Sequence, residues 1–206
     1  RLQYYAYYSK RQSDGYRDNA ESKYDAQAVQ LRFAASRNLT LSAELARSYY
    51  RFRLPGPLND SMYQANPRQA TRARNYYSPE IYVPSLRADW RIGARTQLLW
   101  TVSAILGYRN SVMFDRPSTV VDKIDPATLT YANRQVDIDN FNSYTTELRI
   151  LHAYHIRGMS ATLTTGVQYM NNDLHRQQQG KGTTGSDYDL SITGDWGRNL
   201  HFITQN

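Results

Sequence analysis

Three very short connections, spaced at a nearly constant interval, constrain this chain more than any other feature. They cover residues 36–38, 93–95 and 157–159, about sixty residues apart. Each joins two segments in which apolar and polar residues alternate, the pattern of paired β-strands. Between one short turn and the next runs a long polar loop, 53–80 or 109–140. Short turns at one end and long loops at the other are typical of a transmembrane β-barrel of the bacterial outer membrane.

The period of two predicts strands along most of the chain. They are expected at 1–9, 29–33, 39–45, 85–92, 97–108, 144–154, 160–170 and 188–196, and a ninth begins near residue 200. A barrel in lipid is apolar outside and polar inside. We therefore expect these side chains to face lipid: Leu98, Trp100, Val102, Ala104 and Leu106. The side chains expected to face the interior are Glu147, Arg149, Thr162, Thr164 and Gln168.

Alternation alone does not separate a membrane barrel from a soluble sandwich, so other features must decide. No stretch of about eighteen apolar residues exists, which excludes a transmembrane helix but not a barrel strand. The two long loops exceed what compact soluble domains usually carry. Tyr and Trp side chains also gather at the strand ends, as an aromatic girdle would. These features favour an all-β, antiparallel up-and-down transmembrane β-barrel segment.

Composition points to a binding protein and not to an enzyme. The 206 residues carry a formal net charge of +7, which fits either a solvated basic surface or attraction to anions such as lipid phosphates, nucleic acid or an anionic ligand. There is no Cys, and the four His residues have no metal-ligand spacing. No catalytic constellation stands out. We therefore expect no catalytic residue, no metal ligand and no cofactor.

Arginines in the two long loops are the candidate ligand-binding residues. The planar guanidinium is always charged and pairs with carboxylates through two hydrogen bonds. Arg68, Arg72 and Arg74 fall in the loop 53–80, and Arg109, Arg116 and Arg134 fall in the loop 109–140. Contact with anionic lipopolysaccharide, or no role, is the simpler interpretation for any single one. We select Arg72, Arg74, Arg109 and Arg134 as the cluster that binds an anionic ligand.

Several longer stretches resemble a known family. They are 54–58 (LPGPL), 75–79 (NYYSP), 81–84 (IYVP), 109–112 (RNSV), 134–144 (RQVDIDNFNSY), 166–175 (GVQYMNNDLH) and 179–185 (QGKGTTG). Together they resemble the barrel of TonB-dependent outer-membrane siderophore receptors, in the ferric-citrate receptor branch. The resemblance extends over about residues 24–195, and no single motif in it identifies the ligand.

The resemblance implies a 22-stranded barrel with an N-terminal plug domain, the plugged class of outer-membrane transporters. Residues 1–206 would then be part of the barrel domain of a longer chain, and the plug domain would lie outside these 206 residues. The implied function is import of an iron chelate, ferric citrate or a similar siderophore, with energy from the TonB complex acting through the missing plug. The other implied partners are outer-membrane lipid and lipopolysaccharide, without nucleic acid.

Two other functions stay open. One is a small structural or adhesive outer-membrane barrel, because about eight strands can close on themselves. A piece of a large barrel would instead leave two unpaired strand edges. The other is a soluble β-protein that binds nucleic acid through Arg and Tyr, which requires one contiguous aromatic and basic face.

Overall fold

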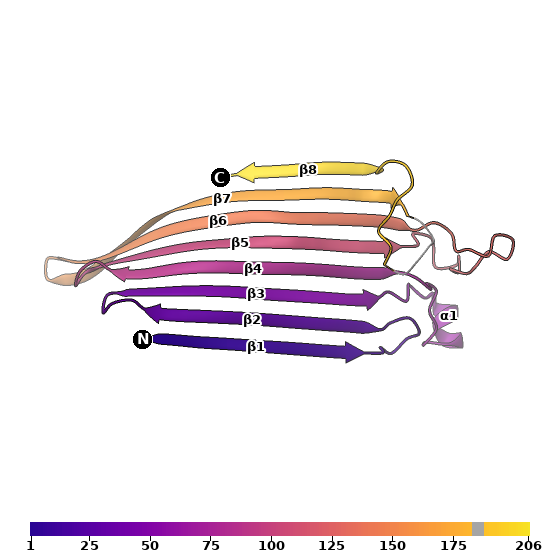
Figure 1. Ribbon diagram of the computed structural model, residues 1–206, viewed down its shortest axis with the longest axis horizontal. Coiled ribbons are helices and arrows are strands. Elements are labelled where there is room, and N and C mark those ends of the chain that lie inside the picture. The colour runs from indigo at the N-terminus through magenta and orange to yellow at the C-terminus, as the bar shows by residue number, and fades with distance from the viewer. Residues whose placement is uncertain (183–187) are drawn as a thin grey trace.

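The computed structural model describes residues 1–182 and 188–206, which form eight strands and one short helix (Figure 1). The helix has six residues, and no helix in the described ranges is long and apolar enough to cross a membrane. In chain order the elements are β1 (Leu2–Ser13), β2 (Ser22–Ala34), β3 (Leu39–Arg53), α1 (Asp60–Ala65), β4 (Tyr76–Arg91), β5 (Thr96–Met113), β6 (Gln135–Ile156), β7 (Met159–Lys181) and β8 (Arg198–Gln205).

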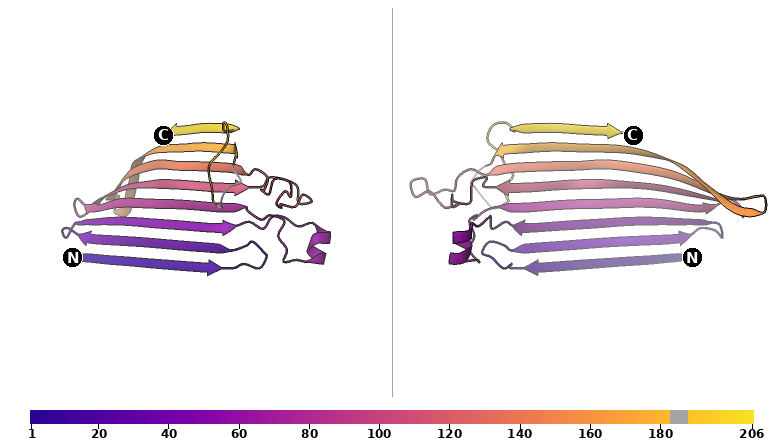
Figure 2. Two further views of the ribbon diagram at one scale, coloured as in Figure 1. Left: turned by 45° about the vertical axis from the view of Figure 1, so that its right-hand side comes forward. Right: turned by 180° about the vertical axis from the view of Figure 1, so that it is seen from behind.

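All eight strands belong to one sheet, in the order β1 to β8, and every neighbouring pair is antiparallel. The predicted up-and-down order is therefore confirmed. The three short turns lie at one end of the sheet and the long connections at the other, as Figure 1 shows. Figure 2 shows that the β6–β7 hairpin reaches furthest at the turn end and bends away there. No pairing between β8 and β1 occurs in the described residues, so the sheet is open with two edges.

Cross-strand partners lie on the same face of a sheet, so the register defines two faces. One row runs from Leu41 through Ala88 and Trp100 to Leu148. The face that contains this row is called the apolar face below, and it carries all five side chains predicted to face lipid. The opposite, polar face pairs Arg149 with Gly166 and carries the five predicted interior side chains. The predicted separation of the two sets is confirmed.

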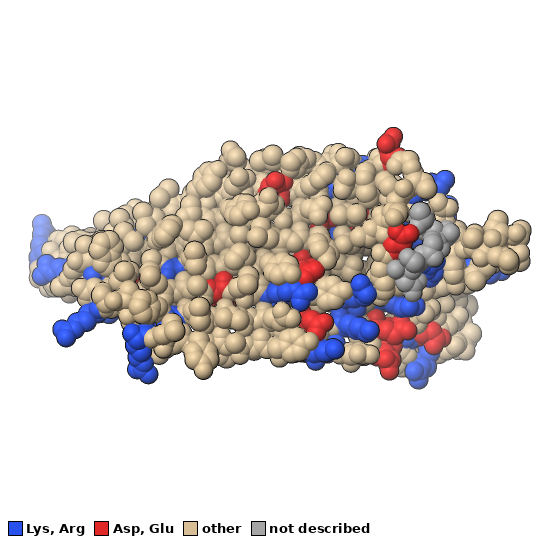
Figure 3. Space-filling view, viewed as in Figure 1, with Lys and Arg blue, Asp and Glu red and all other residues tan. Residues whose placement is uncertain are grey.

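The apolar face has the dimensions of a membrane-facing band. On β5 it runs from Leu98 to Leu106, about nine residues, which at 3.3 Å per residue and a tilt of about 40° is about 23 Å high. Barrels of the outer membrane carry a band of about 25 Å. Large apolar side chains on it are exposed, among them Leu86, Trp100 and Val167. In Figure 3 few charged side chains lie over the middle of the strands, and most gather toward the loop end and the turns.

The prediction of a strand at 188–196 is wrong. These residues form an irregular connection, and the strand after it is β8, so the sheet has eight strands and not nine. The alternation of Tyr188, Leu190 and Ile192 resembles a strand, but these side chains pack instead on a buried cluster of Tyr76, Val112 and Val136. The apolar period therefore reflects burial against the end of the sheet.

The two long loops are shorter than predicted. They cover 54–75 and 114–134, because β4 begins at Tyr76, β5 continues to Met113 and β6 begins at Gln135. The strand ends were missed because charged and amide side chains are frequent in them, among them Arg109, Asn110 and Asp137, although Val112 and Val136 continue an apolar row. As a consequence Arg109 lies on β5 and not in a loop. The end of the 179–185 motif falls in 183–187, outside the described residues.

Candidate functional site: the loop cap

Four connections meet at the loop end of the sheet (Figure 1). They are 14–21, 54–75, 114–134 and the described part of the β7–β8 connection, 188–197, and together they are called the loop cap. Gly56 allows the turn that begins the second of them. Its φ is +81°, and a Cβ there would lie 2.4 Å from the Thr71 hydroxyl oxygen. The local sequence thus brings the two sides of this loop into contact.

Arg72 joins two of these connections through their backbone. Its Nε donates to the Phe114 carbonyl at 3.1 Å, and its Nη1 donates to the Val120 carbonyl at 3.0 Å. A guanidinium has five N–H donors. The side chain is 2% exposed, and its donors are directed at five carbonyl oxygens, those of Thr71, Phe114, Arg116, Pro117 and Val120. Arg72 therefore acts as a structural link between the loops.

Arg134 forms a second buried link. Its Nη2 lies 2.8 Å from Asp122 Oδ1, and the two side chains are 3% and 1% exposed. The other Asp122 oxygen accepts a hydrogen bond from the Ala73 amide at 2.9 Å, so the pair also holds the loop 54–75. The guanidinium carbon lies 5.2 Å from the ring centroids of both Phe114 and Tyr131. Its Nε and Nη1 are buried without a hydrogen-bond partner, which adds to the cost of burying this charge and makes the pairing with Asp122 necessary.

Arg17 extends this linkage to the first connection. It donates to the Gly56 carbonyl at 2.7 Å and to the Gln69 carbonyl at 2.8 Å. Asn19 donates to the Arg72 carbonyl at 3.1 Å. Sequence reasoning missed Arg17 and Asp122, because nothing in the local pattern reveals a bond to a distant carbonyl. The loops at 14–21, 54–75 and 114–134 thus form one connected unit.

Arg74 and Arg109 are more accessible than the two buried arginines. Arg109 lies on the polar face of β5, its side chain is 40% exposed, and it forms an ion pair with Asp139. Asp139 also pairs with Arg176 at 3.0 Å. Arg74 is partly buried, with its guanidinium carbon 5.5 Å from the Tyr131 ring centroid. The structure thus divides the four predicted residues into two structural links and two accessible cations.

A pocket of about 620 Å³ opens between the third connection and the end of β7. Three cationic residues line it, Arg116, Arg134 and Lys181, against one acidic residue, Asp115. Gln135 and Gln179 add amide groups. Carboxylates and phosphates are the groups that such a lining binds. Arg116 and Lys181 were not among the selected candidates, since only the fold brings the end of β7 beside 114–134.

The comparisons with known proteins support the fold alone. No protein-family model and no curated protein sequence matches the chain. Among solved structures, the chain is similar to the ferric citrate transporter FecA in its unliganded form, with 15% sequence identity and a TM-score of 0.82. The likeness covers 99% of this chain and 28% of the FecA chain, so this chain spans little more than a quarter of that protein. It confirms the fold class, an antiparallel up-and-down β-barrel segment.

Proposed function

We propose that this chain forms part of the wall of an outer-membrane receptor that imports an iron chelate, ferric citrate or a similar siderophore, with energy from the TonB system. The observation that carries the proposal is a connected loop cap beside a pocket lined by three cationic residues and one acidic residue, above an exposed apolar band. The likeness to a ferric citrate transporter supports the same class of ligand.

The open sheet supports a large barrel over a small one. β1 and β8 each leave one edge unpaired in the described residues, whereas an eight-stranded barrel would pair them with each other. We propose that further strands complete the barrel and that a separate plug domain transmits energy from TonB. The exposed apolar face argues against a soluble protein that binds nucleic acid, since such patches on soluble proteins promote aggregation.

We propose that Arg74, Arg109, Arg116 and Lys181 contact the carboxylates of the chelate. Arg72 and Arg134 would act as positioning residues that hold the loops in place. The bound iron is cargo carried by its own chelator, so the receptor needs no metal ligands. Preorganised cations lower the entropic cost of binding, because the loops are ordered before the ligand arrives.

The test uses the full-length receptor with Arg74→Gln and Arg109→Gln combined. We expect ferric-citrate binding to weaken about tenfold or more, as two charge-assisted contacts would predict. The amount of barrel in the membrane should stay constant. The matched control is Arg32→Gln with Arg87→Gln, which removes the same charge from the polar face away from the cap. Unchanged binding in the first variant would reject the arginine assignment, and failure of the parent receptor to bind any iron chelate would reject the function.

A further inference from the structure

Aromatic side chains gather on the polar face of β2 to β4, where the strands reach the loop cap. Tyr24 lies opposite Tyr50, with ring centroids 5.4 Å apart and ring planes at 22°. Phe52, two residues further along β3, lies opposite Tyr77 of β4, with ring centroids 5.1 Å apart. These four side chains are called the aromatic shelf below. Each of them is partly exposed, so ring surface is left for a ligand to contact.

Arginines border the aromatic shelf on both sides. On β1, Arg11 lies opposite Tyr24, and its guanidinium carbon is 5.8 Å from the centroid of that ring. On β5, Ser111 lies opposite Tyr77 and is two residues from Arg109, so Arg109 shares the face of the shelf. The register of four pairings thus forms one surface on the polar face, with aromatic rings in the middle and a cation at each side.

The strands around the aromatic shelf carry excess positive charge. Arg109 and Arg176 both form ion pairs with the single carboxylate of Asp139. Asp137 is the other acid on these rows of the polar face. Arg11 forms no ion pair within the residues that the structure describes. Three guanidinium groups thus stand against two carboxylates, so an anionic ligand would be attracted to this surface.

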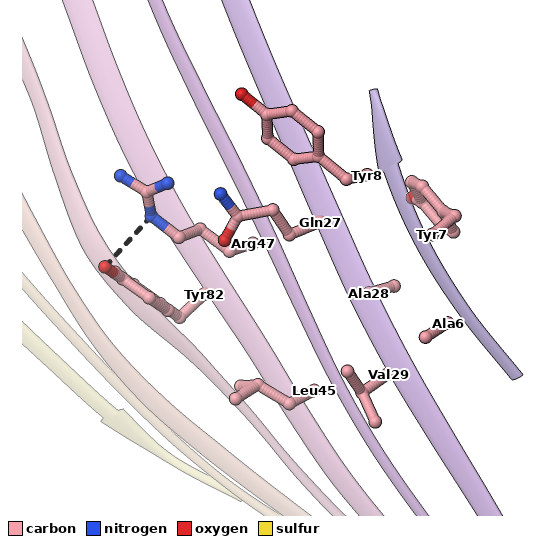
Figure 4. A pocket seen from close by; sticks show the side chains of 9 residues that line it. All are labelled: Ala6, Tyr7, Tyr8, Gln27, Ala28, Val29, Leu45, Arg47 and Tyr82. Atoms are coloured by element: carbon pink, nitrogen blue, oxygen red, sulfur yellow. Dashed lines mark hydrogen bonds between the residues drawn. The ribbon is translucent and has the colours of Figure 1, made fainter. Parts of the chain in front are cut away.

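The apolar face of the same strands also combines rings with an arginine, but there the charge is balanced. The guanidinium carbon of Arg47 lies 5.5 Å from the Tyr49 ring centroid and 5.7 Å from that of Tyr82. Arg47 Nε donates to the Tyr82 hydroxyl at 3.1 Å, as the dashed line in Figure 4 shows. Glu80 completes the group through an ion pair with Arg47 at 2.6 Å. The excess charge beside the rings therefore distinguishes the aromatic shelf from its counterpart on the apolar face.

We infer that the aromatic shelf stacks against a ring of the chelate, so that the imported chelator is an aromatic compound with anionic oxygen atoms. The inference rests on the proposed function and names the class of chelate within it. Aromatic pairs are attractive beyond the area that they bury. β2 and β4 are about 10 Å apart, which leaves room for a ring on the shelf while its oxygens reach the arginines at either side. Citrate carries the anionic oxygens but has no ring, so it gains nothing from the shelf.

The test compares two probes, the iron(III) complexes of 2,3-dihydroxybenzoate and of citrate, on the purified full-length receptor. Equilibrium dialysis with radiolabelled iron measures the affinity for each. We expect the parent to bind the dihydroxybenzoate complex about tenfold more tightly than ferric citrate. Tyr50→Leu combined with Phe52→Leu removes two rings and keeps apolar side chains in their place. This double variant should lose roughly tenfold in affinity for the dihydroxybenzoate complex and bind ferric citrate as the parent does.

Two single variants control for the ring and for its face. Tyr50→Phe keeps the ring and should bind both complexes as the parent does. Tyr49→Leu removes the neighbouring ring on the apolar face and should also leave both affinities unchanged. No loss in the double variant, or an equal loss for both complexes, would overturn the inference.

The parent receptor separates this inference from the proposed function. A parent that binds ferric citrate but not the dihydroxybenzoate complex would overturn the aromatic class of chelate alone and leave the importer standing. A parent that binds neither complex would reject both.

Discussion

The loop end and the turn end of this sheet differ in how they bury side chains. At the loop end Tyr76 is 2% exposed and Val136 is fully buried beneath the residues that follow β7. Toward the turn end Leu86 is 58% exposed and Val167 is 66% exposed, although both are large and apolar. The loop end is therefore stabilised by contacts within the protein. The turn end leaves its apolar side chains exposed, which suits an apolar solvent better than water.

The difference follows from the length of the connections. Two-residue to four-residue turns cannot fold back over a strand, so the turn end has nothing to cover its apolar face. The connections at the loop end are long enough to pack on the sheet and on each other. Exposed apolar side chains are stable in the hydrocarbon of a membrane, where the backbone polar groups of the strands are paired within the sheet.

The largest expected effect is at the buried ion pair of the loop cap. Asp122→Ala should lower the local stability of 114–134 by about 3–5 kcal/mol, because Arg134 would keep its charge without a partner. The Ala73 amide would also lose its acceptor. Amide hydrogen exchange of the loop measures this change directly.

Two controls sharpen this comparison. Asp122→Leu combined with Arg134→Met removes both charges and should cost far less than Asp122→Ala, because replacing a whole buried pair is often close to neutral. Arg37→Ala at an exposed turn should change the exchange rates little. Equal loss of stability in the single and double variants would show that the unpaired charge of Arg134 is not the cause of the loss.

A charge on the apolar face tests whether lipid stabilises the turn side of the sheet. Val102→Arg should cost about 2–4 kcal/mol of unfolding free energy in a bilayer, whereas Thr164→Arg on the polar face should cost little. Denaturant titration of the full-length receptor in lipid vesicles measures both. The membrane-barrel interpretation would not survive equal costs at the two positions.

The smallest expected effect on the unfolding free energy is at Gly107 on β5, between the loop end and the turn end of the sheet. Its φ is +142°, and a Cβ there would lie 2.0 Å from the Glu80 carbonyl oxygen. Gly107→Ala should therefore cost about 2 kcal/mol in the same titration, since strained backbone positions cost about 1–3 kcal/mol. Gly93→Ala is the matched control, because nothing lies within 4 Å of its Cβ position. An unchanged unfolding free energy in Gly107→Ala would show that β4 and β5 can move apart at this position without a loss of stability.

The sequence predicted the strands only where their two faces differ. Residues 97–108 alternate clearly, so their strand and their apolar side were predicted together. Residues 109–111 are polar on both faces, and the segment 109–113 was predicted as loop although Val112 is buried. At 188–196 the period of two arose from packing on Tyr76 and Val136, which no local pattern distinguishes from a strand. The assignment of the chelate-binding residues is a prediction.

Alternation and turn length by themselves determined that this chain forms an antiparallel up-and-down sheet with an apolar and a polar face. Both are local properties, since each residue's face depends only on its neighbours along the strand. The roles of the arginines were decided by tertiary structure alone. Arg72 and Arg109 look alike in sequence, yet Arg72 donates to five backbone carbonyls and Arg109 forms a part-buried ion pair with Asp139. What a guanidinium contacts depends on which distant segments the fold brings within hydrogen-bond reach.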